Sequence, residues 1–181
     1  IRYGAVTKAL MLQSPSGSLD ALVFKFGTEN TEETNTVVFE AEMKITDADG
    51  GNILTVYHKT ADGDIANKMV IGWSAGTGNI FILNMYTVKD GSAKDFDTVI
   101  VSEGMNSYFK LRIEYTKLSD SEILISMYVN GEKIAAIGNS HPYESPAIDA
   151  DDITEMVIET YQSRKTTLYI DNLLLSRTNT D

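Results

Sequence analysis

The stretch TVVFEAEMKI at residues 36–45 sets a pattern that recurs along the whole chain. Apolar and polar side chains alternate in it, so the two kinds fall on opposite faces of an extended strand. The apolar set is Val37, Phe39, Ala41, Met43 and Ile45, and the polar set is Glu40, Glu42 and Lys44. This alternation predicts a β-strand with one face in a core and the other in water.

Period-two alternation returns in 108–116 (YFKLRIEYT) and 122–129 (EILISMYV), while helical periodicity is nearly missing. Because a type I′ turn needs positive φ at both central residues, Asn130-Gly131 predicts a hairpin between 122–129 and 132–137. Further strands are expected at 5–13, 20–26, 53–59, 66–73, 79–87, 96–101, 153–161 and 166–175. About a dozen strands predict an all-β fold, a two-sheet antiparallel β-sandwich of jelly-roll type.

The chain has 181 residues without a linker or repeat, which predicts one sandwich domain over 1–181. Residues 138–152 hold two of the three prolines and are expected to form a long loop that crosses between the sheets. The first residue is Ile rather than Met, and no signal-like leader follows it. These features suggest a fragment of a longer precursor, in which neighbouring domains are expected.

The charge balance argues against two classes of partner. The chain has 15 Lys and Arg residues and 26 Asp and Glu residues, which give a net charge of -11. This charge repels phosphate backbones and anionic lipid headgroups. We therefore expect neither nucleic acid nor a membrane surface as partner. The longest apolar runs have four residues, far short of the roughly 20 that span a bilayer, so no membrane insertion is expected. Cysteine is absent, which excludes disulfides, thiolate zinc sites and cysteine nucleophiles.

Two segments carry a family resemblance. KLRIEYTKLSDSEILISMYVNGEKIAAI at 110–137 resembles the strand, hairpin and turn found late in laminin G-like, concanavalin A-like jelly rolls. LYIDNLLLS at 168–176 is similar to the final strand of many bacterial carbohydrate-binding and surface-protein domains of this type. The resemblance implies a fold shared by lectins, glycoside hydrolases, non-catalytic carbohydrate-binding modules and adhesion domains. The fold does not decide among these functions, so the evidence must come from the site residues.

The glucanase branch of this family carries a Glu-x-Asp-x-x-Glu strand motif, and no such string occurs here. Glu40 and Glu42 come nearest, with carboxylates on one face about 6.5 Å apart by strand rise. A retaining hydrolase needs roughly 5 to 5.5 Å between its carboxyl groups, and Ile45 stands where the third carboxylate would be. We expect the pair to be solvated or matched by a neighbour such as Arg112.

Metal chemistry favours calcium over zinc. With only His58 and His141 present, a multi-histidine zinc site cannot form. Carboxylates and loop carbonyls suit calcium, so a structural calcium ion is considered. The candidate ligands are Asp47 and Asp49, Asp62 and Asp64, Asp149, Asp151 and Asp152, and Asp171, where the resemblance suggests a cation or a backbone hydrogen bond. Asp is also common in turns, which is the alternative reading.

Outward tyrosines are the candidate sugar contacts, because an aromatic ring covers the apolar face of a pyranose while polar neighbours bind its hydroxyls. Alternation places Tyr128 and Tyr169 outward, and Tyr86 shares a face with Asn84. The single Trp73 continues the alternation of Met69 and Ile71, which favours a place in the core over a binding platform. The alternative for each tyrosine is cross-strand packing.

Three functions follow, in order of preference. The first is a non-catalytic, extracellular or cell-surface module that binds a polysaccharide or glycan. Its candidate residues are Tyr86, Tyr128, Tyr169, Trp73, Asn84, Arg112, Glu40 and Glu42. The second is a structural or protein-interaction domain without a small ligand. The third is a glycoside hydrolase or lyase centred on Glu40 and Glu42.

Overall fold

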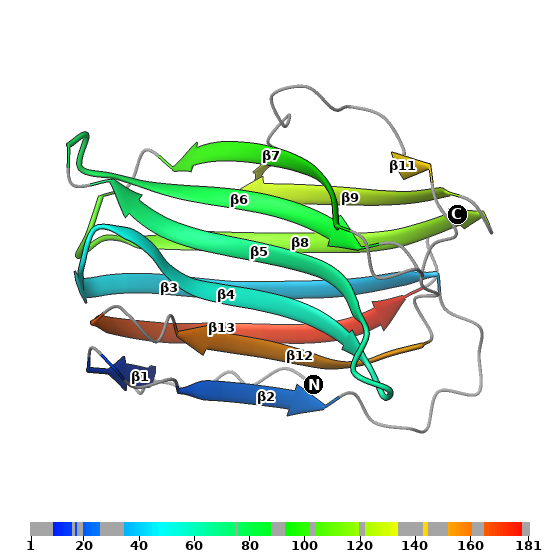
Figure 1. The fold of residues 1–181 in the computed structure, drawn as a ribbon, viewed down its shortest axis with the longest axis horizontal. Coiled ribbons are helices and arrows are strands. Elements are labelled where there is room, and N and C mark those ends of the chain that lie inside the picture. The colour runs from blue at the N-terminus through cyan, green and yellow to red at the C-terminus, as the bar shows by residue number, and fades with distance from the viewer. Residues whose placement is uncertain are drawn as a thin grey trace.

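The computed structural model describes residues 9–15, 17, 20–25, 35–74, 76–87, 93–101, 104–119, 122–133, 143–144, 152–160 and 165–178. These residues form two antiparallel β-sheets whose strands run along the long axis of the molecule (Figure 1). The predicted all-β sandwich is confirmed. No helix within the described ranges has the length and apolar character that crossing a bilayer requires.

One sheet has seven strands. Its order is β1 (Leu10–Ser14), β13 (Thr166–Thr178), β3 (Thr36–Ala48), β8 (Tyr108–Ser119), β9 (Glu122–Val129) and β10 (Glu132–Lys133), and β11 (Tyr143–Glu144) also pairs with β9. β3 lies between β13 and β8, so the segment TVVFEAEMKI belongs to a central strand.

The other sheet has six strands. Its order is β2 (Ala21–Lys25), β12 (Ile153–Thr160), β4 (Gly51–Thr60), β5 (Ile65–Ser74), β6 (Asn79–Thr87) and β7 (Ala93–Val101). The chain changes sheets between β3 and β4, runs as a meander from β4 to β7, and returns to the seven-stranded sheet at β8. It changes sheets again between β11 and β12, as predicted for 138–152. The expected loop contains the two-residue strand β11, and most of its other residues lie outside the described part.

The predicted Asn-Gly hairpin is confirmed. Asn130 and Gly131 have φ angles of 53° and 86°, and Val129 pairs with Glu132 across the turn. Asn130 also fastens the turn to β8, because its side-chain Oδ1 accepts a hydrogen bond from the backbone N–H of Lys110 at 2.9 Å. The partner strand was expected to reach residue 137, and residues 134–137 lie outside the described part.

The core lies between the sheets and takes its side chains from both. Phe39 and Leu111 from the seven-stranded sheet and Leu54, Ile71 and Ile82 from the other are fully buried. Each such side chain contributes about 1.5 to 3 kcal/mol relative to an exposed one. Alternate residues of β3, β4 and β8 therefore point outward, and these positions carry the candidate site.

Several strands run past the ends that alternation predicted. β3 and β13 pair from Thr36 opposite Thr178 to Ala48 opposite Thr166. Backbone hydrogen bonds between these two strands continue where the apolar pattern has stopped, since a ladder depends on register rather than on side-chain type.

Candidate functional site

The outward face of the seven-stranded sheet collects five of the predicted binding residues. Glu40, Glu42, Arg112, Tyr128 and Tyr169 all lie on it, in β3, β8, β9 and β13. Each alternates with core residues of its own strand, which is why they share one face.

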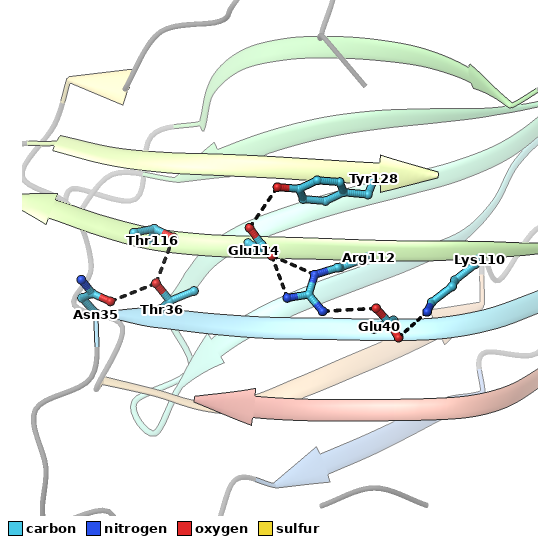
Figure 2. Close-up of polar contacts among 8 residues, drawn as sticks. All are labelled: Asn35, Thr36, Glu40, Lys110, Arg112, Glu114, Thr116 and Tyr128. Atoms are coloured by element: carbon cyan, nitrogen blue, oxygen red, sulfur yellow. Dashed lines mark hydrogen bonds and ion pairs between the residues drawn. The ribbon is translucent and has the colours of Figure 1, made fainter. Parts of the chain in front are cut away.

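A chain of polar contacts crosses three strands of this face, as Figure 2 shows. Glu40 lies between two cations, with Lys110 Nζ 2.7 Å from its Oε1 and Arg112 Nη1 3.2 Å from its Oε2. Arg112 also contacts Glu114, with Nη2 2.7 Å from Oε1. The Tyr128 hydroxyl donates to Glu114 Oε2 at 3.3 Å. We call Glu40, Lys110, Arg112, Glu114 and Tyr128 the polar network, and its two cations balance its two carboxylates.

The network fixes the ionisation of Glu40. Burial raises the pKa of this carboxyl, but the hydrogen bonds and charges of Lys110 and Arg112 outweigh burial and hold it below its ordinary value. Glu42 is bound elsewhere, because its Oε2 accepts a hydrogen bond from Asn172 Nδ2 at 2.9 Å. A glycosidase acid needs a raised pKa, so Glu40 does not suit acid catalysis. The expected match between Glu40 and Arg112 is confirmed.

A second group lies on the same face, in one cross-strand row. Tyr169 of β13 pairs with Lys44 of β3, which pairs with Tyr108 of β8, and Met11 of β1 continues the row beyond Tyr169. The ammonium of Lys44 lies 4.8 Å from the ring centroid of Tyr108 and 5.2 Å from that of Tyr169. Tyr108 is 45% exposed and Met11 is 52% exposed. We call Tyr169, Lys44 and Tyr108 the tyrosine row.

A β-bulge next to the tyrosine row directs the side-chain amide of Asn172 toward Glu42. The register of β13 against β3 shifts between Asp171 and Leu174, and Asn172 has a φ of 50°. In this left-handed conformation the Asn172 backbone N–H donates to Asp171 Oδ1 at 2.8 Å, while its side chain reaches Glu42. The polar groups beside the tyrosine row are therefore Glu42, Asp171 and Asn172.

Sequence reasoning missed Lys44, Tyr108 and Asn172 as binding candidates. The bulge coincides with a break in the period of two. Ile170 and Leu173 stand three residues apart in the sequence, and both are buried in the structure. The contact between Lys44 and the two rings depends on strand register, which the sequence did not supply.

The carboxylates predicted for calcium have protein partners. Asp47 pairs with Lys165 Nζ, Asp49 Oδ2 accepts from the Lys165 backbone N–H at 3.0 Å, and Asp171 accepts from the N–H of Asn172. In the part of the chain that the structure describes, no three Asp, Glu or His side chains gather to hold a metal. Asp47, Asp49 and Asp171 therefore have partners within the protein, and the turn reading suits Asp49. Asp149 and Asp151 lie outside the described residues, and Asp62, Asp64 and Asp152 are exposed.

Three predicted residues belong to the six-stranded sheet instead. Trp73 packs against the core, as expected, and its indole nitrogen is buried without a hydrogen-bond partner among the described residues. Asn84 and Tyr86 lie in β6, and their side chains lie outside the described part. Tyr86 therefore does not join Tyr128 and Tyr169 on one sheet.

The outward face of the six-stranded sheet carries a cluster that sequence reasoning also missed. The Tyr57 hydroxyl donates to Glu159 Oε2 at 3.1 Å. The ammonium groups of Lys59 and Lys68 lie 5.3 Å and 5.5 Å from the Tyr57 ring centroid. Only the pairing of β4 with β5 brings Lys68 opposite Tyr57, so spacing along the chain gave no signal.

Comparison with known proteins identifies the fold. No protein-family model and no curated protein matches the chain. Among solved structures, the carbohydrate recognition domain of Emp47p matches 98% of this chain and 86% of its own, with a TM-score of 0.61 at 10% identity. A carbohydrate esterase of the Shiga toxin-encoding bacteriophage phi24B matches 98% of this chain and 84% of its own, with a TM-score of 0.61 at 14% identity.

A third neighbour is the family 7 alginate lyase A1-II′, determined in complex with substrate. It matches 99% of this chain and 82% of its own, with a TM-score of 0.56 at 9% identity. At these identities the likeness concerns the fold alone. The chain has a jelly-roll β-sandwich fold, and the same architecture serves a recognition domain and two enzymes.

Proposed function

We propose that this domain is a non-catalytic carbohydrate-binding module that works outside the cell or at its surface. The tyrosine row is its binding site. The laminin G-like resemblance of residues 110–137 supports this reading, as do neighbours that recognise or act on carbohydrates.

The observation that carries the proposal is the placement of two tyrosines in one row of one sheet face. Tyr108 and Tyr169 stand two strands apart, which corresponds to about 9.6 Å. Each ring offers apolar area with a polar handle, and sugar rings present apolar faces bordered by hydroxyls. A chain of sugars lying across β13, β3 and β8 would contact both tyrosines.

The groups around the rings supply both kinds of hydrogen bond that a sugar hydroxyl needs. Lys44 can only donate, while the carboxylates of Glu42 and Asp171 can only accept. Asn172 already orients Glu42 by its side-chain amide. Such an arrangement favours a hydroxyl-rich ligand over a purely apolar one, because each hydroxyl both donates and accepts.

Two observations support a binding role over hydrolysis. Glu40 is held ionised between Lys110 and Arg112, and Glu42 is held by Asn172. The pKa of Glu40 is held below its ordinary value by Lys110 and Arg112, whereas a glycosidase needs a carboxyl group with a raised pKa as its acid.

The second candidate is a structural or protein-interaction domain. Leu10 and Met11 favour it, because these exposed apolar side chains lie on β1, the edge strand of the seven-stranded sheet. An edge strand can pair with another chain through its free backbone groups. Under this reading the domain binds no glycan.

Calorimetric titration with neutral glucans, xylans, galactans and mannans tests the proposal. We expect one of these polymers to bind, and the double substitution Tyr108→Ala and Tyr169→Ala to weaken binding about tenfold or more. Leu118→Ala is the matched control, because Leu118 lies on the same face of β8 and is 48% exposed. Absence of binding to every polymer, or unchanged affinity in the double variant, would overturn the proposal.

A further inference from the structure

The outward face of the six-stranded sheet holds two lysines around one tyrosine. Tyr57 and Lys59 lie on β4, and Lys68 lies directly opposite Tyr57 on β5. Both ammonium groups lie within 5.5 Å of the Tyr57 ring centroid. All three side chains are half-buried, so the charges are held in place against the sheet.

The nearby carboxylates have other partners. Glu155 pairs with Lys25 at 3.1 Å although Lys59 is its cross-strand neighbour, and Glu159 accepts the Tyr57 hydroxyl. Among the described residues, no ion pair joins Lys59 or Lys68 to a carboxylate. In a chain of net charge -11, this spot keeps two positive charges available to a negative ligand.

The outward face beside the cluster is partly apolar. Thr55, Val70 and Val157 have outward alternation, and their side chains are buried. Further along β5, Gly72 has no side chain, and the Phe81 ring of β6 occupies the space where a Cβ would be. Tyr57 and Phe81 are two strands and four residues apart, roughly 16 Å by strand spacing and rise. A ligand that touches both is longer than one sugar ring.

We propose that Tyr57, Lys59 and Lys68 form a second binding site, which takes a polysaccharide bearing carboxylate or sulfate groups. The acidic groups pair with the two lysines, and the sugar rings lie on Tyr57 and Phe81. This site is on the opposite sheet from the tyrosine row, so it stands independently of the proposed function.

An acidic peptide fits this surface less well. Peptides often bind sheets by adding a strand to an edge, where backbone groups are free. β4 and β5 are interior strands paired on both sides, so they have no free backbone edge. Recognition here must come from rings and charges, which an acidic glycan can engage.

The test is binding of polygalacturonate, which carries carboxylates, and dextran sulfate, which carries sulfates. We expect the double substitution Lys59→Met and Lys68→Met to weaken binding of the preferred polymer at least about tenfold, and about 0.5 M NaCl to weaken wild-type binding similarly. Met keeps an apolar stem against the sheet, and a thermal melt checks folding. Lys59→Arg with Lys68→Arg should retain binding.

The matched control removes two charges elsewhere. Lys133→Met with Lys165→Met lowers the net charge equally, from exposed positions in β10 and just before β13, and should bind like the wild type. Binding of either polymer that depends on Lys59 and Lys68 supports the site and identifies its acidic group.

Three results would overturn the second site: no binding of either polymer, equal loss in the control, or polyglutamate binding as tightly as the polysaccharides. Failure of the proposed function would look different. It would appear as absent neutral-glycan binding while the binding of polygalacturonate or dextran sulfate still responds to Lys59 and Lys68.

Discussion

His58 and Tyr115 meet inside the core, with ring centroids 6.3 Å apart and ring planes inclined by 49°. His58 comes from β4 and Tyr115 from β8, so the contact joins the two sheets. Both side chains are fully buried, and neither imidazole nitrogen has a hydrogen-bond partner among the described residues. Burial lowers the pKa of His58 to about 4.

The buried imidazole makes stability depend on acid. His58 titrates near 6.5 when unfolded and about 4 when folded, so the unfolded state binds the proton more readily. The stability that neutral His58 contributes is complete above pH 6.5 and is lost as pH falls toward 4, by up to about 3 kcal/mol. Urea denaturation between about pH 7.5 and 4.5 measures this loss.

The control is His58→Leu, which cannot take up a proton. Carboxylates contribute equally to the acid dependence of both proteins, so the difference in slope isolates the histidine. Equal slopes in the wild type and the variant would show that His58 does not titrate as its burial implies.

Arg112 is expected to stabilise the seven-stranded sheet more than Lys110 does. It bridges Glu40 and Glu114, so Arg112→Met leaves two half-buried carboxylates without their shared partner and should cost about 1 to 2 kcal/mol. Lys110 contacts Glu40 alone and is more exposed, so Lys110→Met should cost less than about 0.5 kcal/mol. Chemical denaturation of both variants gives the comparison, and equal losses would contradict the bridging role.

Gly72 is required where Phe81 lies across the sheet. A Cβ at this position would overlap Phe81 Cζ and lie 2.7 Å from the carbonyl oxygen of Gly51. Gly72→Ala should therefore cost about 1 to 3 kcal/mol in unfolding free energy. The same substitution made together with Phe81→Ala should cost less, because the ring is gone while the Gly51 contact stays. A cost that is unchanged without the ring would refute this explanation.

Alternation predicted the sandwich because a strand with one apolar face must bury that face against a second sheet. Phe39 and Leu111 are buried as expected, and Glu40 and Arg112 meet on the outer face. Alternation gives the face of each residue and nothing about which strand lies beside it. The contacts of Lys44 with Tyr169 and of Lys68 with Tyr57 depend on pairing between separate segments, so the sequence could not predict them.

The sequence also could not predict the surroundings of individual side chains. His58 stands at a core position of an alternating strand, where the pattern indicates burial without indicating which atoms surround the imidazole. Tyr86 was grouped with Tyr128 and Tyr169 as a sugar contact, although the fold places it in a different sheet. A tyrosine that shares a strand face with polar residues can belong to either sheet, and only topology decides.

Substitutions of Asn172 can separate its effect on the backbone conformation of the bulge from its contribution to ligand binding. Its φ of 50° is left-handed, which Asn tolerates and Ala resists. Asn172→Ala should cost about 1 kcal/mol, whereas Asn172→Gly should keep stability within about 0.5 kcal/mol because glycine adopts this conformation without strain. Both variants lose the amide that orients Glu42 beside the tyrosine row.

If the tyrosine row binds a glycan, Asn172→Gly should weaken that binding about threefold or more while the protein stays as stable as the wild type. Calorimetry with the bound polymer and thermal denaturation of the same samples separate the two effects. A glycine variant with unchanged affinity would remove Glu42 and Asn172 from the site and restrict Asn172 to shaping the bulge.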